Sequence, residues 1–112
     1  MRQRARPGPR RALAGAAIAV LMALQAAYAA GATHTVVIEG MRFSPEVLKV
    51  QRGDTVVWVN RDLVAHTATS HPAFDSGAIA PGQSWRTVAL APGHHDYVCT
   101  LHPTMKAVLE VE

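Results

Sequence analysis

Short apolar runs separated by turn residues make up the chain after residue 32. The runs are four to seven residues long, and none repeats its apolar positions with the period of an α-helix. Runs of this kind, rich in valine and bounded by Gly, Pro, Asn or Asp, are typical of β-strands. We therefore expect strands at residues 34–39, 46–50, 55–60, 65–70, 84–90, 94–99 and 106–111, and a long loop over 71–83.

The run TVVWVN at 55–60 is the strongest strand candidate. Because side chains alternate along a strand, Val56 and Trp58 would point to one face, and Val57 and Val59 to the other. A strand that is apolar on both faces belongs in the interior of a sheet. Seven short strands with turn signals at regular spacing predict an all-β fold, a β-sandwich.

The first 29 residues follow a different pattern. Residues 1–11 hold five arginines and no acidic residue, residues 12–24 are apolar, and small residues follow. A basic start, a short apolar segment and an Ala-x-Ala site describe a secretory signal peptide. We predict a signal peptide over 1–29, cleaved before Ala30, and one domain over 30–112. The apolar run is shorter than the roughly 20 residues of a spanning helix, so we expect no stable membrane span after cleavage.

Cleavage would change the charge of the protein. The whole chain has 11 basic and 8 acidic side chains, a net charge of +3; without the five arginines of the signal, six basic residues remain against eight acidic ones, a net charge of −2. The basic character therefore belongs to the targeting segment and gives no reason to expect a nucleic-acid partner. The signal predicts a periplasmic protein, exported by the Sec route or, given Arg10-Arg11, by the twin-arginine route.

The mature chain has a single cysteine, Cys99, in the segment DYVCTLHPTM. Exported proteins usually place cysteines in disulfides, but one cysteine cannot form a disulfide within its own chain. His102 and Met105 follow within seven residues, and a thiolate, an imidazole and a thioether together favour copper over magnesium or calcium. The trigonal copper geometry needs a second histidine. His66, just beyond the strongest strand, is placed to supply it.

Other roles for these residue types stay open on the residues alone. Cys99 would also suit a buried apolar position or a nucleophile paired with a histidine, although a chain this short leaves little room for a substrate cleft. We expect the remaining histidines to be solvated surface residues. Adjacent strand residues point to opposite faces, so the neighbours His94 and His95 would not readily share a metal. The remaining histidines are His34, His71, His94 and His95.

From about residue 34 to its end the chain resembles the cupredoxins, the small blue (type I) copper proteins, and most of all amicyanin and plastocyanin. The similar segments are MRFSPEVLKVQRGDTVVWVN, VAHT, FDSGAIAPGQSW and PGHHDYVCTLHPTM. The resemblance implies a Greek-key β-sandwich of about seven to eight strands that binds one type I copper ion. It implies His66, Cys99 and His102 as equatorial ligands and Met105 as the axial ligand. The short Cys-x₂-His-x₂-Met loop is amicyanin-like.

Two features depart from the family pattern. Family members often have Pro before and Asn after the first histidine, where this chain has Ala65 and Thr67. That Asn helps to hydrogen-bond the two ligand loops together, and the Thr67 hydroxyl is a candidate substitute. The interval from His66 to Cys99 also looks shorter than in amicyanin, so we expect the HPAFDSG side of the molecule to differ.

The resemblance implies an electron carrier rather than an enzyme, one that shuttles single electrons between redox partners through Cu(I) and Cu(II). His102 would be the electron port, and a transient redox partner would dock near His102, Leu101 and Pro103, since a small apolar face suits brief contact. We expect a monomer. The alternative is a periplasmic copper-binding or copper-delivery protein without an electron-transfer role.

Overall fold

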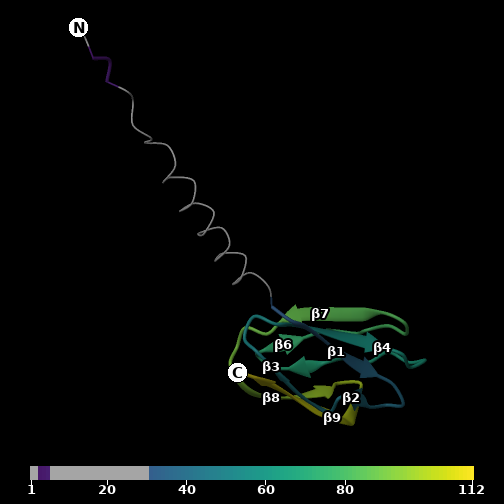
Figure 1. The fold of residues 1–112 in the computed structure, drawn as a ribbon. Coiled ribbons are helices and arrows are strands. Elements are labelled where there is room, and N and C mark those ends of the chain that lie inside the picture. Colours follow the sequence, from purple (N-terminus) through teal and green to yellow (C-terminus); the bar gives the residue numbers. More distant parts are fainter. Residues whose placement is uncertain (1–2, 6–30) are drawn as a thin grey trace. The chain divides into compact units, whose positions relative to one another are not determined.

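The computed structural model describes residues 3–5 and 31–112, and the strands lie in the unit Gly31–Glu112. The predicted signal peptide over 1–29 lies outside the described residues except for residues 3–5, so it stays a prediction. No helix in the described part of the chain is long and apolar enough to span a membrane. The regular structure of that part consists of β-strands (Figure 1).

Nine strands follow one another in the unit. They are β1 (Thr33–Ile38), β2 (Phe43–Ser44), β3 (Val47–Val50), β4 (Thr55–Asn60), β5 (Thr69–Ser70), β6 (Phe74–Asp75), β7 (Ser84–Val88), β8 (Gly93–Cys99) and β9 (His102–Val111).

The strands form two sheets. One has four strands in the order β2-β1-β4-β7, and the other has five in the order β3-β9-β8-β5-β6. The pairs β1·β4 and β3·β9 are parallel, and the remaining pairs are antiparallel. Two mixed sheets without a helix in the described residues confirm the predicted all-β sandwich, with nine strands in place of seven to eight because several strands are only two residues long.

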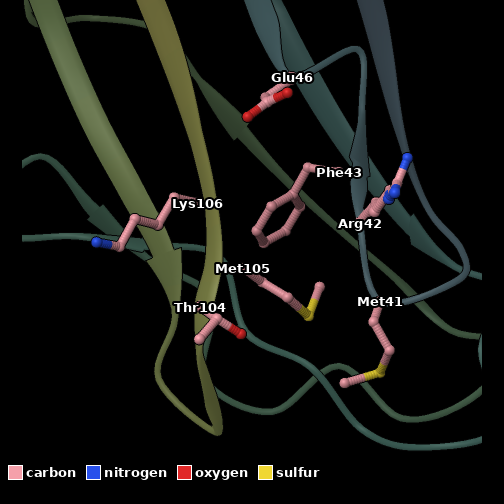
Figure 2. A pocket seen from close by; sticks show the side chains of 7 residues that line it. All are labelled: Met41, Arg42, Phe43, Glu46, Thr104, Met105 and Lys106. Carbon is pink, nitrogen blue, oxygen red and sulfur yellow. The ribbon is translucent and has the colours of Figure 1, made fainter.

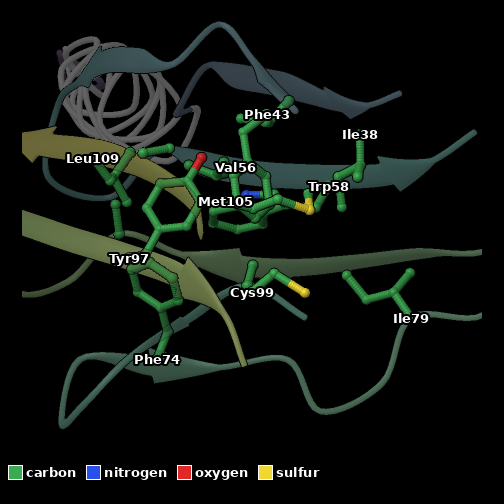
Figure 3. Close-up of a cluster of buried hydrophobic side chains, with 14 of the residues drawn as sticks. Ile38, Phe43, Val56, Trp58, Phe74, Ile79, Tyr97, Cys99, Met105 and Leu109 are labelled. Carbon is green, nitrogen blue, oxygen red and sulfur yellow. The ribbon is translucent and has the colours of Figure 1, made fainter. Parts of the chain in front are cut away.

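One cluster of apolar side chains fills the core (Figure 3). Trp58 from β4 and Tyr97 from β8 are buried within it, and their rings lie 5.7 Å apart in an edge-to-face arrangement, which is favourable for aromatic pairs. Along β4, fully buried Val56, Trp58 and Asn60 alternate with half-buried residues. The interior position predicted for this strand is confirmed, since β1 and β7 flank it.

The predicted strand boundaries differ from the structure in two places that matter for function. The last strand begins at His102 rather than at residue 106, because β8 and β9 form a tight hairpin in which Cys99 lies opposite His102. The predicted strand over 65–70 is a strand only at its end, and before it His66 makes a single β-bridge with Ile79. The first difference places His102 at the start of β9, and the second places His66 in the segment between β4 and β5, paired only with Ile79.

Candidate metal centre

Cys99 and His102 lie on either side of the turn between β8 and β9. Cys99 ends β8, His102 begins β9, and the register shifts between Val98 and Cys99. Such an irregularity re-aims the side chains next to it. The Sγ atom of Cys99 and the Nδ1 atom of His102 lie 3.6 Å apart, so the hairpin alone brings two of the predicted ligands together.

His66 reaches the same place from the loop that follows β4. Its N–H donates to the carbonyl of Ile79 at 3.2 Å, and its own carbonyl accepts the N–H of Ile79 at 2.7 Å. These two bonds fix the backbone of a fully buried residue. The Nδ1 atom of His66 lies 3.6 Å from Cys99 Sγ.

The spacing of the three donor atoms fits one trigonal metal ion. All three lie within 4.8 Å of one another. An ion about 2.0 Å from a nitrogen and about 2.3 Å from a sulfur would separate those donors by about 3.7 Å at an angle of 120°, close to the 3.6 Å that both histidines show. One thiolate and two imidazoles in this arrangement suit a single copper ion.

Met105 lies on β9, three residues after His102, and its side chain is buried. In Figure 3 the sulfur atoms of Cys99 and Met105 both lie toward the side of the core where Ile38 and Ile79 are found. This position is compatible with a fourth, weaker thioether ligand.

Met105 also lines a pocket of about 440 Å³ (Figure 2). The other residues that line it come from the turn before β2, from the start of β2, from the segment between β2 and β3, and from β9: Met41, Arg42, Phe43, Glu46, Thr104 and Lys106. Because Met41 and Met105 line the same pocket, the turn that carries Met41 lies near the side chain of Met105.

The hydroxyl of Thr67 joins the two ligand segments. Thr67 Oγ1 accepts the N–H of Thr100 at 2.8 Å and lies 3.0 Å from Thr100 Oγ1. The N–H of Thr67 donates to Cys99 Sγ at 3.3 Å. Bonds of this kind orient ligands and tune the metal. The sequence suggests that the Thr67 hydroxyl could replace the Asn of the family pattern. In the structure this hydroxyl does make a hydrogen bond that links the two ligand loops.

Asn60 shapes the loop that carries His66, a role that the strand pattern alone did not reveal. Its buried side-chain amide donates to the carbonyls of Val64 and Ile79, at 2.8 and 2.9 Å. Its Oδ1 accepts the N–H of Asp62 at 2.9 Å. The last bond is an Asx turn, and an Asn at the end of a strong strand is the signal that could have revealed it.

Asp62 is the second functional residue that was not predicted from the sequence. Its Oδ2 lies 2.8 Å from His66 Nε2, and the carboxylate also accepts the N–H groups of Gly40 and Met41 at 2.7 and 3.0 Å. Burial raises the pKa of the Asp62 carboxyl, but the bonds from Met41, His66 and Gly40 outweigh it and hold the pKa below the ordinary 3.8. The Asp62 carboxyl is therefore ionised at neutral pH, and its Oδ2 lies within hydrogen-bond distance of His66 Nε2.

The other four histidines lie away from this centre, each with its own partner. The pairs are His34 with Asp54 at 2.9 Å, His71 with Asp75 at 3.4 Å, His94 with Asp96 at 3.1 Å, and His95 with the carbonyl of Ala91 at 2.7 Å. His71 and His94 are exposed as predicted, whereas His34 and His95 are half-buried. Among the described residues, His66, Cys99 and His102 form the one group of three His, Cys, Asp or Glu side chains with metal-binding spacing.

Several known proteins are similar to this chain in sequence or in structure. A family model described as "Cupredoxin-like domain" matches residues 12–111. Amicyanin-alpha from Methylorubrum extorquens is 32% identical over 118 residues, which cover 91% of this chain and 99% of that protein. A solved structure of the Cu(I) form of an amicyanin mutant is similar with a TM-score of 0.68 and 29% identity. The matched region covers 78% of this chain and 89% of the amicyanin chain.

A larger copper protein is similar over part of its length only. The copper-containing nitrite reductase from Thermus scotoductus has a TM-score of 0.67 and 29% identity, over 71% of this chain but 22% of that chain. The likeness therefore concerns one portion of that enzyme. The match to the family model over nearly the whole chain, with an amicyanin relative aligned along almost its full length, shows that the chain belongs to the cupredoxin-like family.

Proposed function

We propose that the protein is a small exported blue copper protein that carries single electrons between redox partners. His66, Cys99 and His102 are the proposed equatorial ligands, and Met105 is the proposed axial ligand. The observation that carries the proposal is the pair of 3.6 Å separations between Cys99 Sγ and the two Nδ1 atoms. The amicyanin relative and the Cu(I) amicyanin structure support it.

Copper supplies a one-electron couple between Cu(II) and Cu(I) when it is bound. The chain holds the donors in one arrangement for both oxidation states: Asp62 and Ile79 restrain His66, and the N–H of Thr67 donates to Cys99 Sγ. Cys99 and His66 are fully buried, so water is kept away from them. A stiff, dry centre rearranges little when an electron arrives or leaves.

Apolar side chains near His102 form the proposed docking face for a transient redox partner. Leu101 and Pro103 flank His102 and are exposed. Leu63, in the loop that leads to His66, is 94% exposed and is proposed as a further apolar residue of this face. A small apolar face suits a partner that must leave quickly, and the protein itself is proposed to act as a monomer in the periplasm after loss of residues 1–29.

A copper-delivery role and an enzymatic role are both less well supported. Delivery requires ready exchange of the metal, whereas His66 and Cys99 are fully buried. With Met105 as a fourth donor, the centre would have no open position for a substrate, unlike catalytic metal sites. The likeness to nitrite reductase covers only 22% of that chain.

The first test is the visible spectrum and EPR of the purified protein with Cu(II), beside the variant Cys99→Ser. We expect an intense blue thiolate-to-copper charge-transfer band and a small copper hyperfine splitting, both lost in Cys99→Ser. His94→Ala, which changes an exposed histidine, is the matched control and should keep both signals. A pale protein whose ordinary copper signal survives Cys99→Ser would contradict the assignment.

A further inference from the structure

We infer that Asp62 is a positioning residue of the copper centre, which holds His66 with its metal-facing nitrogen free and its ring in place. The inference deepens the proposed function and rests on it, because it takes His66 as a copper ligand. Asp62 itself is not a ligand. It acts through the far side of the imidazole ring.

The carboxylate of Asp62 is held by a turn far upstream in the sequence. Gly40 and Met41 adopt positive φ angles of 62° and 60°, and Met41 is the one non-glycine residue with a positive φ in the described part of the chain. That backbone conformation is unfavourable for a residue with a Cβ atom. It turns two successive N–H groups toward the same carboxylate, at 2.7 and 3.0 Å, as in the backbone nests that bind anions.

The same carboxylate then determines which nitrogen of His66 carries the proton. Its Oδ2 lies 2.8 Å from Nε2, and the side chains of His66 and Asp62 are 0% and 14% exposed, so little water competes for this bond. With the proton on Nε2, the lone pair of Nδ1 is free on the side of Cys99 Sγ. Carboxylates that accept a bond from the far nitrogen of a metal-binding histidine fix its tautomer and raise its basicity.

A negative charge behind a ligand also favours the more highly charged oxidation state. Asp62 should therefore stabilise Cu(II) relative to Cu(I) and lower the reduction potential. The chain offers a matched comparison, because Asp54 makes the same kind of contact at the start of β4: it lies 2.9 Å from His34 Nε2 and accepts the N–H groups of Ala32 and Gln51. His34 is not among the donors of the centre.

The test compares wild-type protein, Asp62→Asn and Asp54→Asn. We expect Asp62→Asn to raise the reduction potential in a redox titration and to weaken Cu(II) binding about 10- to 100-fold in competition with a chelator. Asp54→Asn should leave both quantities unchanged. In copper-free wild-type protein, long-range ¹H–¹⁵N NMR should place the proton of His66 on Nε2, a measurement that needs neither copper nor a variant that folds.

Two results would overturn the inference: a proton on Nδ1 of His66 in the copper-free protein, or Asp62→Asn with the potential and Cu(II) affinity of the wild type. Failure of the proposed function looks different. In that case the wild-type protein with Cu(II) lacks the blue band. The NMR result still shows whether Asp62 holds the proton of His66 on Nε2.

Discussion

Single polar side chains decide how the donors of the centre are held. Thr67 is the clearest example, because its hydroxyl accepts the N–H of Thr100, next to Cys99, while its own N–H donates to the sulfur. A hydroxyl can accept two bonds and donate one, so one short side chain can link two loops. The link ties the loop of His66 to the hairpin that carries the other donors.

Thr67→Val keeps the shape of the side chain but removes this link. The N–H of Thr100 would lose its acceptor, so we expect the free energy of unfolding to fall by about 1–2 kcal/mol, and the reduction potential to shift as the bond to Cys99 relaxes. Urea unfolding of the copper-free protein and a redox titration measure the two effects. Thr35→Val, on the exposed face of β1, is the control, and equal stability of the two variants would argue against the link.

Strand ends, rather than strand middles, carry the functional contacts of this fold. β4 ends at Asn60, which shapes the loop of His66, β8 ends at Cys99 and β9 begins at His102. The opposite end of β4 is tied differently. There Asp54 connects the turn at Gln51 to the start of β1 through Ala32 and His34.

This tie predicts how stability depends on pH. The hydrogen bond from His34, then those from Gln51 and Ala32, lower the pKa of the Asp54 carboxyl below 3.8. A carboxyl with a lowered pKa in the folded state stabilises the fold above its unfolded pKa and loses that contribution as the pH falls through the folded value. The free energy of unfolding should therefore drop below about pH 3.8.

Asp54→Asn should be less stable than wild type at pH 7, and its stability should fall less steeply below pH 3.8. Urea unfolding of the copper-free proteins at pH 7 and at several pH values below 3.8 measures the difference. Some acid dependence should remain, because the pKa values of Asp62 and Asp75 are also lowered. Parallel curves for the two proteins would show that Asp54 does not contribute in this way.

Across the whole molecule, the two ends of the sandwich differ in what they offer to a partner. The end with the metal centre exposes Leu63 and Leu101 close to the donors in sequence. Leu90 is also exposed, but it follows β7 at the other end, where Ala89 bonds to Gly53 and Asp54. Exposed leucines at both ends allow a direct test of which face transfers electrons.

Leu101→Lys should slow electron self-exchange between two copies of the protein about tenfold or more, because it places like charges where the two apolar faces would meet. The rate is read from NMR line broadening in mixtures of the Cu(I) and Cu(II) forms. The reduction potential should stay near that of the wild type. Leu90→Lys is the matched control, and an equal loss in both variants would indicate a general effect of charge rather than a docking face.

Local pattern was enough to predict much of this protein. The run at 55–60 is a strand with the predicted ends and an interior position, because apolar alternation and turn residues act over a few neighbours. Two-residue strands such as Phe43–Ser44 are too short to carry a pattern. Cys99 and His102 could be placed together from their spacing, since the two residues between them allow only a tight turn.

Only the tertiary structure decided how the rest of the centre is built. The approach of His66 to Cys99, the choice of Nδ1 as the facing atom, the link from Thr67 to Thr100 and the hold of Gly40 and Met41 on Asp62 all join residues from separate loops. Sequence spacing does not determine such contacts, because they depend on how two sheets pack and on the direction each side chain takes from its backbone. The residue types needed for a copper centre can therefore be recognised in the sequence, whereas the hydrogen bonds that orient them arise from tertiary packing.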